Sequence, residues 1–179
     1  MKETEKAISE VLKNSPQPFD DKHGIKTRQW LLKLKPDASE EMQVAALIHD
    51  IDRAVPPRVI RGKEEYYDDY KKRHAMRSAE IAQHFLIENG YDEEKSQKVR
   101  DLVEKHEVGG DSESDFLRDA DSITFFDSIV NDYESTGAAK LETKIRFMYS
   151  RCSERAKEII RGLKFEPEIK KIFDKAISQ

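Results

Sequence analysis

Six residues in this chain are of types that bind transition metals. They are His23, His49, Asp50, His74, His106 and Asp121. Imidazole nitrogens and carboxylate oxygens suit divalent manganese, iron, cobalt, nickel or zinc. A lone cysteine, Cys152, rules out an intramolecular disulfide and a thiolate cluster. The chemistry that these residue types favour is therefore that of a metal site built from histidine and carboxylate ligands.

Helical spacing places two of the histidines among apolar residues. His23 lies on the same expected helix face as Trp30 and Leu34, and His106 ends a stripe that includes Val99 and Leu102. An imidazole on such a face points toward the core. Both rings are therefore expected to lie inside the protein.

The same spacing applies to His74 and Asp121. His74 shares a face with Ile81 and Phe85, whereas Asp121 lies between Leu117 and Phe125. A carboxylate in that position is costly unless a partner compensates its charge. A cation is the simplest such partner.

His49 and Asp50 directly follow the apolar run AALI. Adjacent ligands leave the end of one helix at different angles, so this pair can hold one or two metal ions. With six candidate ligands, the sequence favours a site richer than a closed tetrahedral one.

The elements that must position these residues are expected to be helices. Helical periodicity recurs along the chain, and no stretch alternates as a strand would, so the predicted fold is all-α. The expected helices cover about 3–13, 19–34, 37–48, 70–89, 92–106 and 114–133, followed by two or three amphipathic helices in 138–179 that are separated near Gly162 and Pro167. Asp37 and Asp92 are expected to begin helices, and Gly90 to end one. Residues 55–67 are expected to form an exposed basic loop.

Length and charge favour one globular domain over residues 1–179. Its expected core covers about 19–133, with the helices of 138–179 packed on it. The net charge of -4 comes from acidic and basic residues mixed along the chain, which argues against duplex nucleic acid as a partner. No segment resembles a signal peptide or a membrane span, so a cytoplasmic protein that binds no membrane is expected.

The candidate ligands occur in the order found in a known family. The segments AALIHDID, LRDADSITFFD and VEKHEVGG, with His23 one helix before the first, resemble the HD superfamily of metal-dependent phosphohydrolases. The resemblance covers roughly residues 23–132. Asp52 departs from it, because glycine is commoner in the family at this position.

The resemblance implies roles for the six residues. His23, His49, Asp50 and Asp121 would hold one metal ion. His74 and His106 match the extra histidines of members with two ions, in which Asp50 would be the bridging aspartate. One ion and two ions both remain open at this point.

Three other residues near the motifs need an interpretation. Arg53 is the preferred phosphate ligand, because its offset from Asp50 resembles the His-Asp-x-x-basic pattern of the family. Asp119 competes with Asp121 as a ligand, but Asp121 follows an alanine as the family's aspartate does. His84 is expected at the surface or at the boundary of the core. The remaining basic residues near the motifs are expected on solvated faces, namely Arg58, Arg61, Lys72, Arg73, Arg77 and Lys105.

These observations predict a metal-dependent phosphohydrolase that acts on a nucleotide or another small phosphate ester through a metal-activated water. Asp50 and Arg53 are the expected catalytic residues. One alternative is an oxygenase with a mixed-valence di-iron centre, since some HD proteins use the same six ligands. Another is a nucleotide-binding module without catalysis. The sequence leaves open the substrate, the metal and the oligomeric state.

Overall fold

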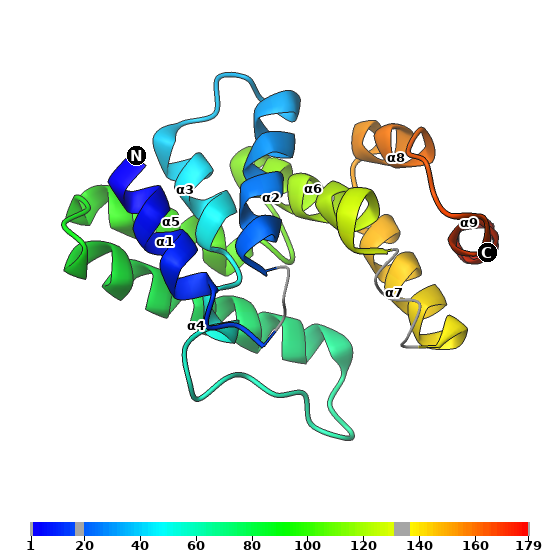
Figure 1. Ribbon diagram of the computed structural model, residues 1–179, viewed down its shortest axis with the longest axis horizontal. Coiled ribbons are helices and arrows are strands. Elements are labelled where there is room, and N and C mark those ends of the chain that lie inside the picture. The colour runs from blue at the N-terminus through cyan, green and yellow to red at the C-terminus, as the bar shows by residue number, and fades with distance from the viewer. Residues whose placement is uncertain (1, 17–19, 131–136, 179) are drawn as a thin grey trace.

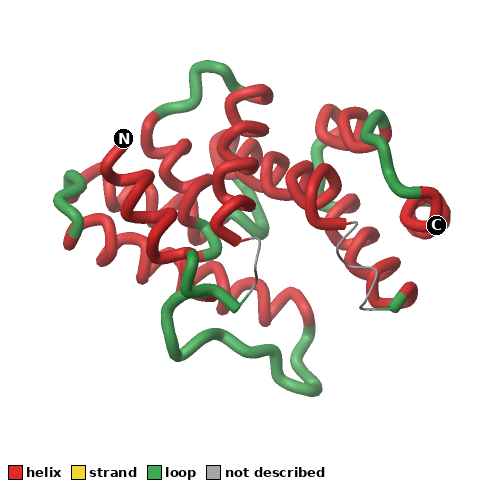
Figure 2. The backbone as a smooth tube through the Cα atoms, in the orientation of Figure 1, coloured by secondary structure: helices red, strands yellow, loops and turns green. Residues whose placement is uncertain are grey.

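The computed structural model describes residues 2–16, 20–130 and 137–178, and the regular secondary structure in these ranges is entirely helical (Figures 1 and 2). The prediction of an all-α fold is therefore confirmed. None of the described helices is both long enough and apolar enough to cross a membrane.

The helices follow one another as expected, within a few residues at their ends. They are α1 (Lys2–Leu12), α2 (Asp20–Leu34), α3 (Glu40–Ile48), α4 (Tyr67–Glu88), α5 (Glu93–Lys105), α6 (Ser112–Thr124), α7 (Ala138–Ser150), α8 (Glu154–Arg161) and α9 (Pro167–Ile177). A short 3₁₀ helix, η1 (Ile51–Arg53), follows α3, and a π-helical segment, η2 (Phe125–Ile129), continues α6. The expected start of the second helix at Phe19 and the expected end of the sixth at Tyr133 lie outside the described residues.

The start of α3 corrects one expectation. Ser39, and not Asp37, is its N-cap, because the Ser39 hydroxyl accepts a hydrogen bond from the Met42 backbone N–H at 3.2 Å. The Asp37 carboxylate accepts a hydrogen bond from Lys35 Nζ at 2.9 Å on the surface. Asp37, two residues before Ser39, thus pairs with a lysine instead of capping the helix.

The other two expected helix ends are as predicted. The Asp92 carboxylate accepts a hydrogen bond from the Lys95 backbone N–H at 2.9 Å at the start of α5. Gly90, just after α4, has a φ of 77°, a left-handed conformation that favours glycine. Between α3 and α4, Pro56, Pro57 and Arg58 are exposed, as expected for this connection.

The helices share one hydrophobic core. Helix α2 packs between α3 and α6, and α4 packs along α5, whereas α7, α8 and α9 lie together beyond α6 (Figure 1). The buried apolar side chains form one cluster that extends from Ile8 in α1 through Leu31 and Ile123 to Phe173 in α9. The ends of α2 and α3 and the middle of α6 therefore have fixed positions relative to one another.

Gly24 sets the contact between α2 and α3. A Cβ atom built on Gly24 would lie 2.3 Å from the backbone oxygen of Leu47. Only glycine permits this approach of the two backbones. Since Gly24 follows His23 and Leu47 precedes His49 by two residues, the same contact brings these two histidines together.

Substituting Gly24 with alanine is therefore expected to separate α2 from α3 and to lower the free energy of unfolding by about 1–3 kcal/mol. Chemical denaturation of the metal-free protein measures this loss. Gly62→Ala is the control, since a Cβ there meets no atom closer than 3.4 Å. Equal stability of the two variants would show that the α2–α3 contact tolerates a methyl group.

Candidate metal centre

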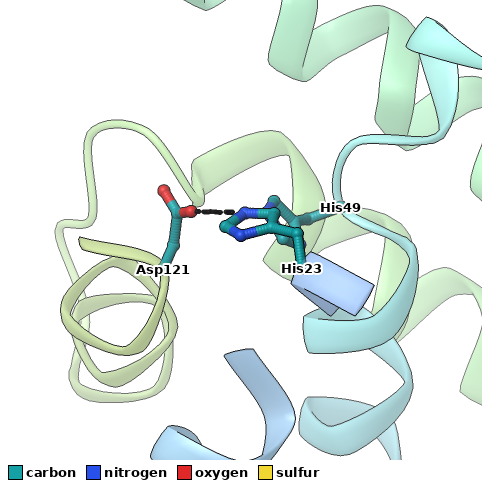
Figure 3. Close-up of side chains that lie close together, drawn as sticks. All are labelled: His23, His49 and Asp121. Carbon is teal, nitrogen blue, oxygen red and sulfur yellow. Dashed lines mark hydrogen bonds and ion pairs between the residues drawn. The ribbon is translucent and has the colours of Figure 1, made fainter. Parts of the chain in front are cut away.

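Three of the predicted ligands form a first buried group, defined here as triad 1: His23 from α2, His49 from the end of α3 and Asp121 from α6 (Figure 3). His23 Nε2 lies 2.9 Å from Asp121 Oδ1 and 3.2 Å from His49 Nε2. His49 Nε2 is 3.5 Å from the same carboxylate oxygen. Two imidazole nitrogens and one carboxylate oxygen thus converge on one small volume, as ligands of one metal ion would.

The other three predicted ligands form a second buried group, triad 2: Asp50, His74 and His106. Asp50 precedes η1, His74 lies in the second turn of α4, and His106 ends α5. His74 Nε2 is 2.8 Å from Asp50 Oδ1, and the rings of His74 and His106 are 5.6 Å apart. One ligand atom from each residue lies within 4.8 Å of the others, so this group could also hold a metal ion.

The Asp50 carboxylate lies between the two triads. Its Oδ1 faces His74, whereas its Oδ2 is 3.5 Å from His49 Nε2 and 3.6 Å from His23 Nε2. Each oxygen therefore faces a different group of histidines. This arrangement follows from the chain path, because His49 is the C-cap of α3 and Asp50 is already outside that helix.

Hydrogen bonds hold three of the imidazole rings in defined orientations. His49 Nδ1 lies 3.0 Å from the Ala46 carbonyl oxygen and His106 Nδ1 lies 2.6 Å from that of Val103. His74 Nδ1 is 2.6 Å from Asp52 Oδ1. Since carbonyl and carboxylate oxygens only accept hydrogen bonds, each Nδ1 carries the proton, and each Nε2 is left to bind a metal.

Two nitrogens of the centre, His23 Nδ1 and His106 Nε2, have no hydrogen-bond partner among the described residues. His106 Nε2 is buried, and although Glu107 Oε1 lies 3.2 Å away, the two atoms do not have hydrogen-bond geometry. A buried polar atom without a partner costs about 1–3 kcal/mol. A metal ion bound to His106 Nε2 would remove that cost, so the residues present fit a metal.

The carboxylates make the centre attractive to positive charge. Burial lowers the pKa of His49, but the charge of Asp50 and a hydrogen bond to Asp121 outweigh it and raise that pKa to about 9. Burial raises the pKa of Asp50 and of Asp121, yet neighbouring cations outweigh this and hold both well below the usual range. The same negative charge that favours a proton on His49 would favour a metal ion.

Beside the triads lies a buried ion-pair cluster that the sequence did not predict, made of Lys71, Glu107 and Arg151. The Glu107 carboxylate pairs with Lys71 through one oxygen and with Arg151 through the other. Arg151 also donates a hydrogen bond to Asp121 Oδ2. Burial raises the pKa of Glu107, but the charges of Lys71 and Arg151 hold it well below its usual range. Because Arg151 is the C-cap of α7, its contact with Asp121 links α7 to triad 1.

Two of these three residues have a sequence signal. Lys71 precedes His74 by three residues, which places both on one face of α4, and Glu107 is adjacent to His106. Arg151 has no such signal, since it follows Asp121 by 30 residues in a segment without a motif.

Arg53, the predicted phosphate ligand, contacts two carboxylates. Its Nη1 lies 2.6 Å from Asp50 Oδ2 and 3.0 Å from Asp20 Oδ1. The Arg53 side chain is 29% exposed. It therefore lies at the border between the buried Asp50 and the solvent.

The structure also places Asp119, the competing ligand candidate, and the residues that were expected at the surface. Asp119 is buried, and its carboxylate accepts hydrogen bonds from the backbone N–H and the hydroxyl of Ser153, so it anchors the start of α8 and lies in neither triad. His84 is exposed, as predicted. Exposure is also confirmed for Arg58, Arg61, Lys72, Arg73 and Lys105, whereas Arg77 is half-buried.

Comparison with known proteins places the chain in a family. No curated protein and no solved structure matches it. A family match covers residues 3–173, and it is to a family other than the HD phosphohydrolases that the motifs resemble. The chain belongs to the family described as Domain of unknown function (DUF4202).

Proposed function

We propose that this protein is a metal-dependent phosphohydrolase with an HD-type centre, which acts on a small phosphate ester. The observation that carries the proposal is the pair of buried triads with Asp50 between them, one of its carboxylate oxygens facing the histidines of each. Four histidines and two aspartates in this arrangement suit two divalent ions.

The ligands divide between the ions as the triads do. His23, His49 and Asp121 would hold one, His74 and His106 the other, and Asp50 both. A divalent ion held there supplies a Lewis acid and lowers the pKa of a water molecule toward neutrality.

Positive side chains next to the triads support an anionic substrate. Arg53 lies beside Asp50. Arg151 pairs with Asp121, and both Lys71 and Arg151 pair with Glu107, the residue next to His106. Because the charges of Lys71 and Arg151 are already paired with Glu107 and Asp121, we infer that these two cations mainly hold the ligands in place. Arg53 is partly exposed and has further N–H donors, so we assign it to the phosphate.

Arg53→Ala is expected to lower kcat/KM for a phosphate ester by about 10- to 100-fold, because one charge-assisted contact to the phosphate is lost. Arg53→Lys is expected to recover only part of this, since an ammonium cannot make a forked contact. Steady-state kinetics and metal analysis of each variant measure the two effects separately.

The control for Arg53 is Arg73→Ala, which removes an exposed arginine whose side chain binds Glu65 and the Ile60 carbonyl and belongs to neither triad. It is expected to leave kcat/KM unchanged. If Arg53→Ala empties the metal centre, then Arg53 acts by holding Asp50 in place and the phosphate role is wrong.

A screen of purified protein tests the function itself. Protein loaded in turn with manganese, iron, cobalt, nickel or zinc is incubated with phosphomonoesters, nucleotides and cyclic dinucleotides, and phosphate or product release is measured. Release in at least one metal supports the proposal. Oxygen consumption by iron-loaded protein without phosphate release would instead identify the oxygenase alternative. Ligand binding without turnover in any of the metals would identify the binding module.

A further inference from the structure

A pocket of about 600 Å³ lies between the first turn of α4 and one face of α7. Its lining residues are Arg61, Tyr67, Asp68, Ala139, Lys140, Thr143, Lys144 and Phe147. Pockets of this size commonly hold small organic ligands. The family resemblance ends before α7, so it assigns no role to the α7 wall of this pocket.

The walls combine aromatic rings with positive charge. The rings of Tyr67 and Phe147 pack edge to face, with centroids 4.8 Å apart. Three lining side chains are basic, namely Arg61, Lys140 and Lys144, and one, Asp68, is acidic. A ligand that matches these walls has an aromatic body and a negative charge.

Lys144 is half-buried, whereas the other two basic lining residues, Arg61 and Lys140, are exposed. Lys144 Nζ lies 3.0 Å from the Tyr67 hydroxyl and within 6.0 Å of the ring centres of Tyr67, Phe125 and Phe147. Within residues 2–16, 20–130 and 137–178, no ion pair joins it to a carboxylate. An ammonium group has three donors, so an anion in the pocket could accept from those that Tyr67 does not use.

Tyr67 lies about one turn before Lys71 on α4, and Lys144 lies about two turns before Arg151, the C-cap of α7, so both helices run from the pocket toward the buried ion-pair cluster. Burial and the charge of Lys71 lower the pKa of Lys144 to about 7, and the charges of Glu107 and Asp121 act on it as well. Burial raises the pKa of Tyr67, on which the charges of Lys71 and Glu107 also act. The buried ion-pair cluster, which contacts Asp121 and His106, thus lies between the pocket and the triads.

Other pockets among the described residues have a different character. One between α3 and α5 is lined by more acidic than basic side chains, including Glu41, Asp101 and Glu113. Another, beside α4 and α5, balances Arg77 and Arg100 against Glu80 and Glu88. Neither has the combination of net positive charge and two packed aromatic rings.

We propose that the α4–α7 pocket binds the organic group of the substrate, that this group is aromatic, as in a nucleoside monophosphate, and that Lys144 contacts the phosphate. This inference rests on the proposed function, since it takes the ester phosphate to lie at the triads. It adds a specificity-determining pocket from helix α7.

The test uses metal-loaded protein and two probes that cannot be hydrolysed. One is the analogue of adenosine 5′-monophosphate in which a methylene group replaces the ester oxygen, and the other is the same analogue of ribose 5-phosphate, which lacks the base. Titration calorimetry measures the Kd of each probe. The variants are Lys144→Met and Lys144→Arg, with Lys170→Met as control on an exposed residue of α9. Circular dichroism and metal analysis are run on every sample.

Wild type is expected to bind the adenosine probe at least tenfold more tightly than the ribose probe. Lys144→Met is expected to raise the Kd of the adenosine probe at least tenfold with metal content unchanged, whereas Lys144→Arg and Lys170→Met stay within about threefold of wild type. If Lys144→Met does not fold, the Lys144→Arg variant and the comparison of the two probes still decide.

Three results would overturn the inference: no binding of either probe by metal-loaded wild type, equal affinity for the two probes, or a folded Lys144→Met within twofold of wild type. The proposed function fails separately. If the adenosine probe binds through Lys144 but no ester is hydrolysed in any metal, the pocket stands and the phosphohydrolase activity is wrong.

Discussion

Asp50→Ala is expected to remove most of the bound metal and to lower phosphate release by roughly a thousandfold, because several kcal/mol of electrostatic stabilisation are lost with the ions. No other residue of the centre places one oxygen toward each triad. Metal per chain and kcat/KM are measured on the same preparation.

The fold is expected to survive this substitution, because each partner of Asp50 keeps another carboxylate. Arg53 keeps Asp20, His74 keeps Asp52, and His23 keeps Asp121. No buried cation is therefore left alone, which is the situation that costs several kcal/mol.

The matched control is Asp69→Ala, which removes an exposed aspartate of α4. It is expected to keep wild-type metal content and activity. Equal metal content in well-folded wild-type and Asp50→Ala protein would show that Asp50 is not a metal ligand.

A second large effect concerns pH. In the metal-free protein the stabilising contribution of His49 is expected to be complete below about pH 6.5 and to be lost as pH rises to about 9. The folded-state pKa of His49 is raised from 6.5 to about 9 by Asp50 and Asp121, so the folded protein holds this proton more tightly than the unfolded chain. A shift of this size corresponds to on the order of 3 kcal/mol.

The measurement is the difference in the free energy of unfolding between wild type and His49→Gln, taken across that pH window. The difference isolates His49 from Lys144, whose pKa is lowered by burial to about 7 and whose own contribution therefore increases with pH. His84→Gln, at an exposed histidine, is the control. A wild-type minus His49→Gln difference that does not change with pH would mean that the two carboxylates do not hold a proton on His49.

Metal should reverse this behaviour. An ion bound to His49 Nε2 displaces the proton, so metal affinity is expected to rise with pH as the competing proton leaves. Unfolding of metal-loaded protein over the same pH range is therefore expected to show stabilisation by metal that increases toward pH 9.

The sequence predicted the helices well because their signals are local. Periodic apolar residues, the capping carboxylate of Asp92 and the left-handed Gly90 each act within a few residues. The error at Asp37 is also local: two capping residues compete, and Ser39 is the nearer to the helix while Lys35 takes the carboxylate of Asp37.

The structure brings together all six predicted ligands, since each carried a local signal, either an apolar helix face or a motif. Their role as ligands remains a prediction. The family resemblance had implied their division into two groups with Asp50 between them. The contacts that produce this division, namely the α2–α3 contact at Gly24 and the turn that separates His49 from Asp50, were not accessible from the sequence.

The charges around the centre were the hardest part to predict. Arg151 reaches Asp121 from another helix, and in a chain with 38% charged residues no spacing distinguishes it from the arginines at the surface. Asp52, which departs from the glycine of the resembled family, has a partner in His74 Nδ1 that only the folded chain reveals.

Metal titration of the purified protein, followed by elemental analysis, tests the central claim most directly. Wild type is expected to saturate at two divalent ions per chain. His74→Ala and His106→Ala are expected to approach one ion, held by His23, His49 and Asp121. Saturation of wild type at a single ion that both variants retain would contradict the two-ion centre, and failure of wild type to bind any ion in metal excess would contradict the metal centre altogether.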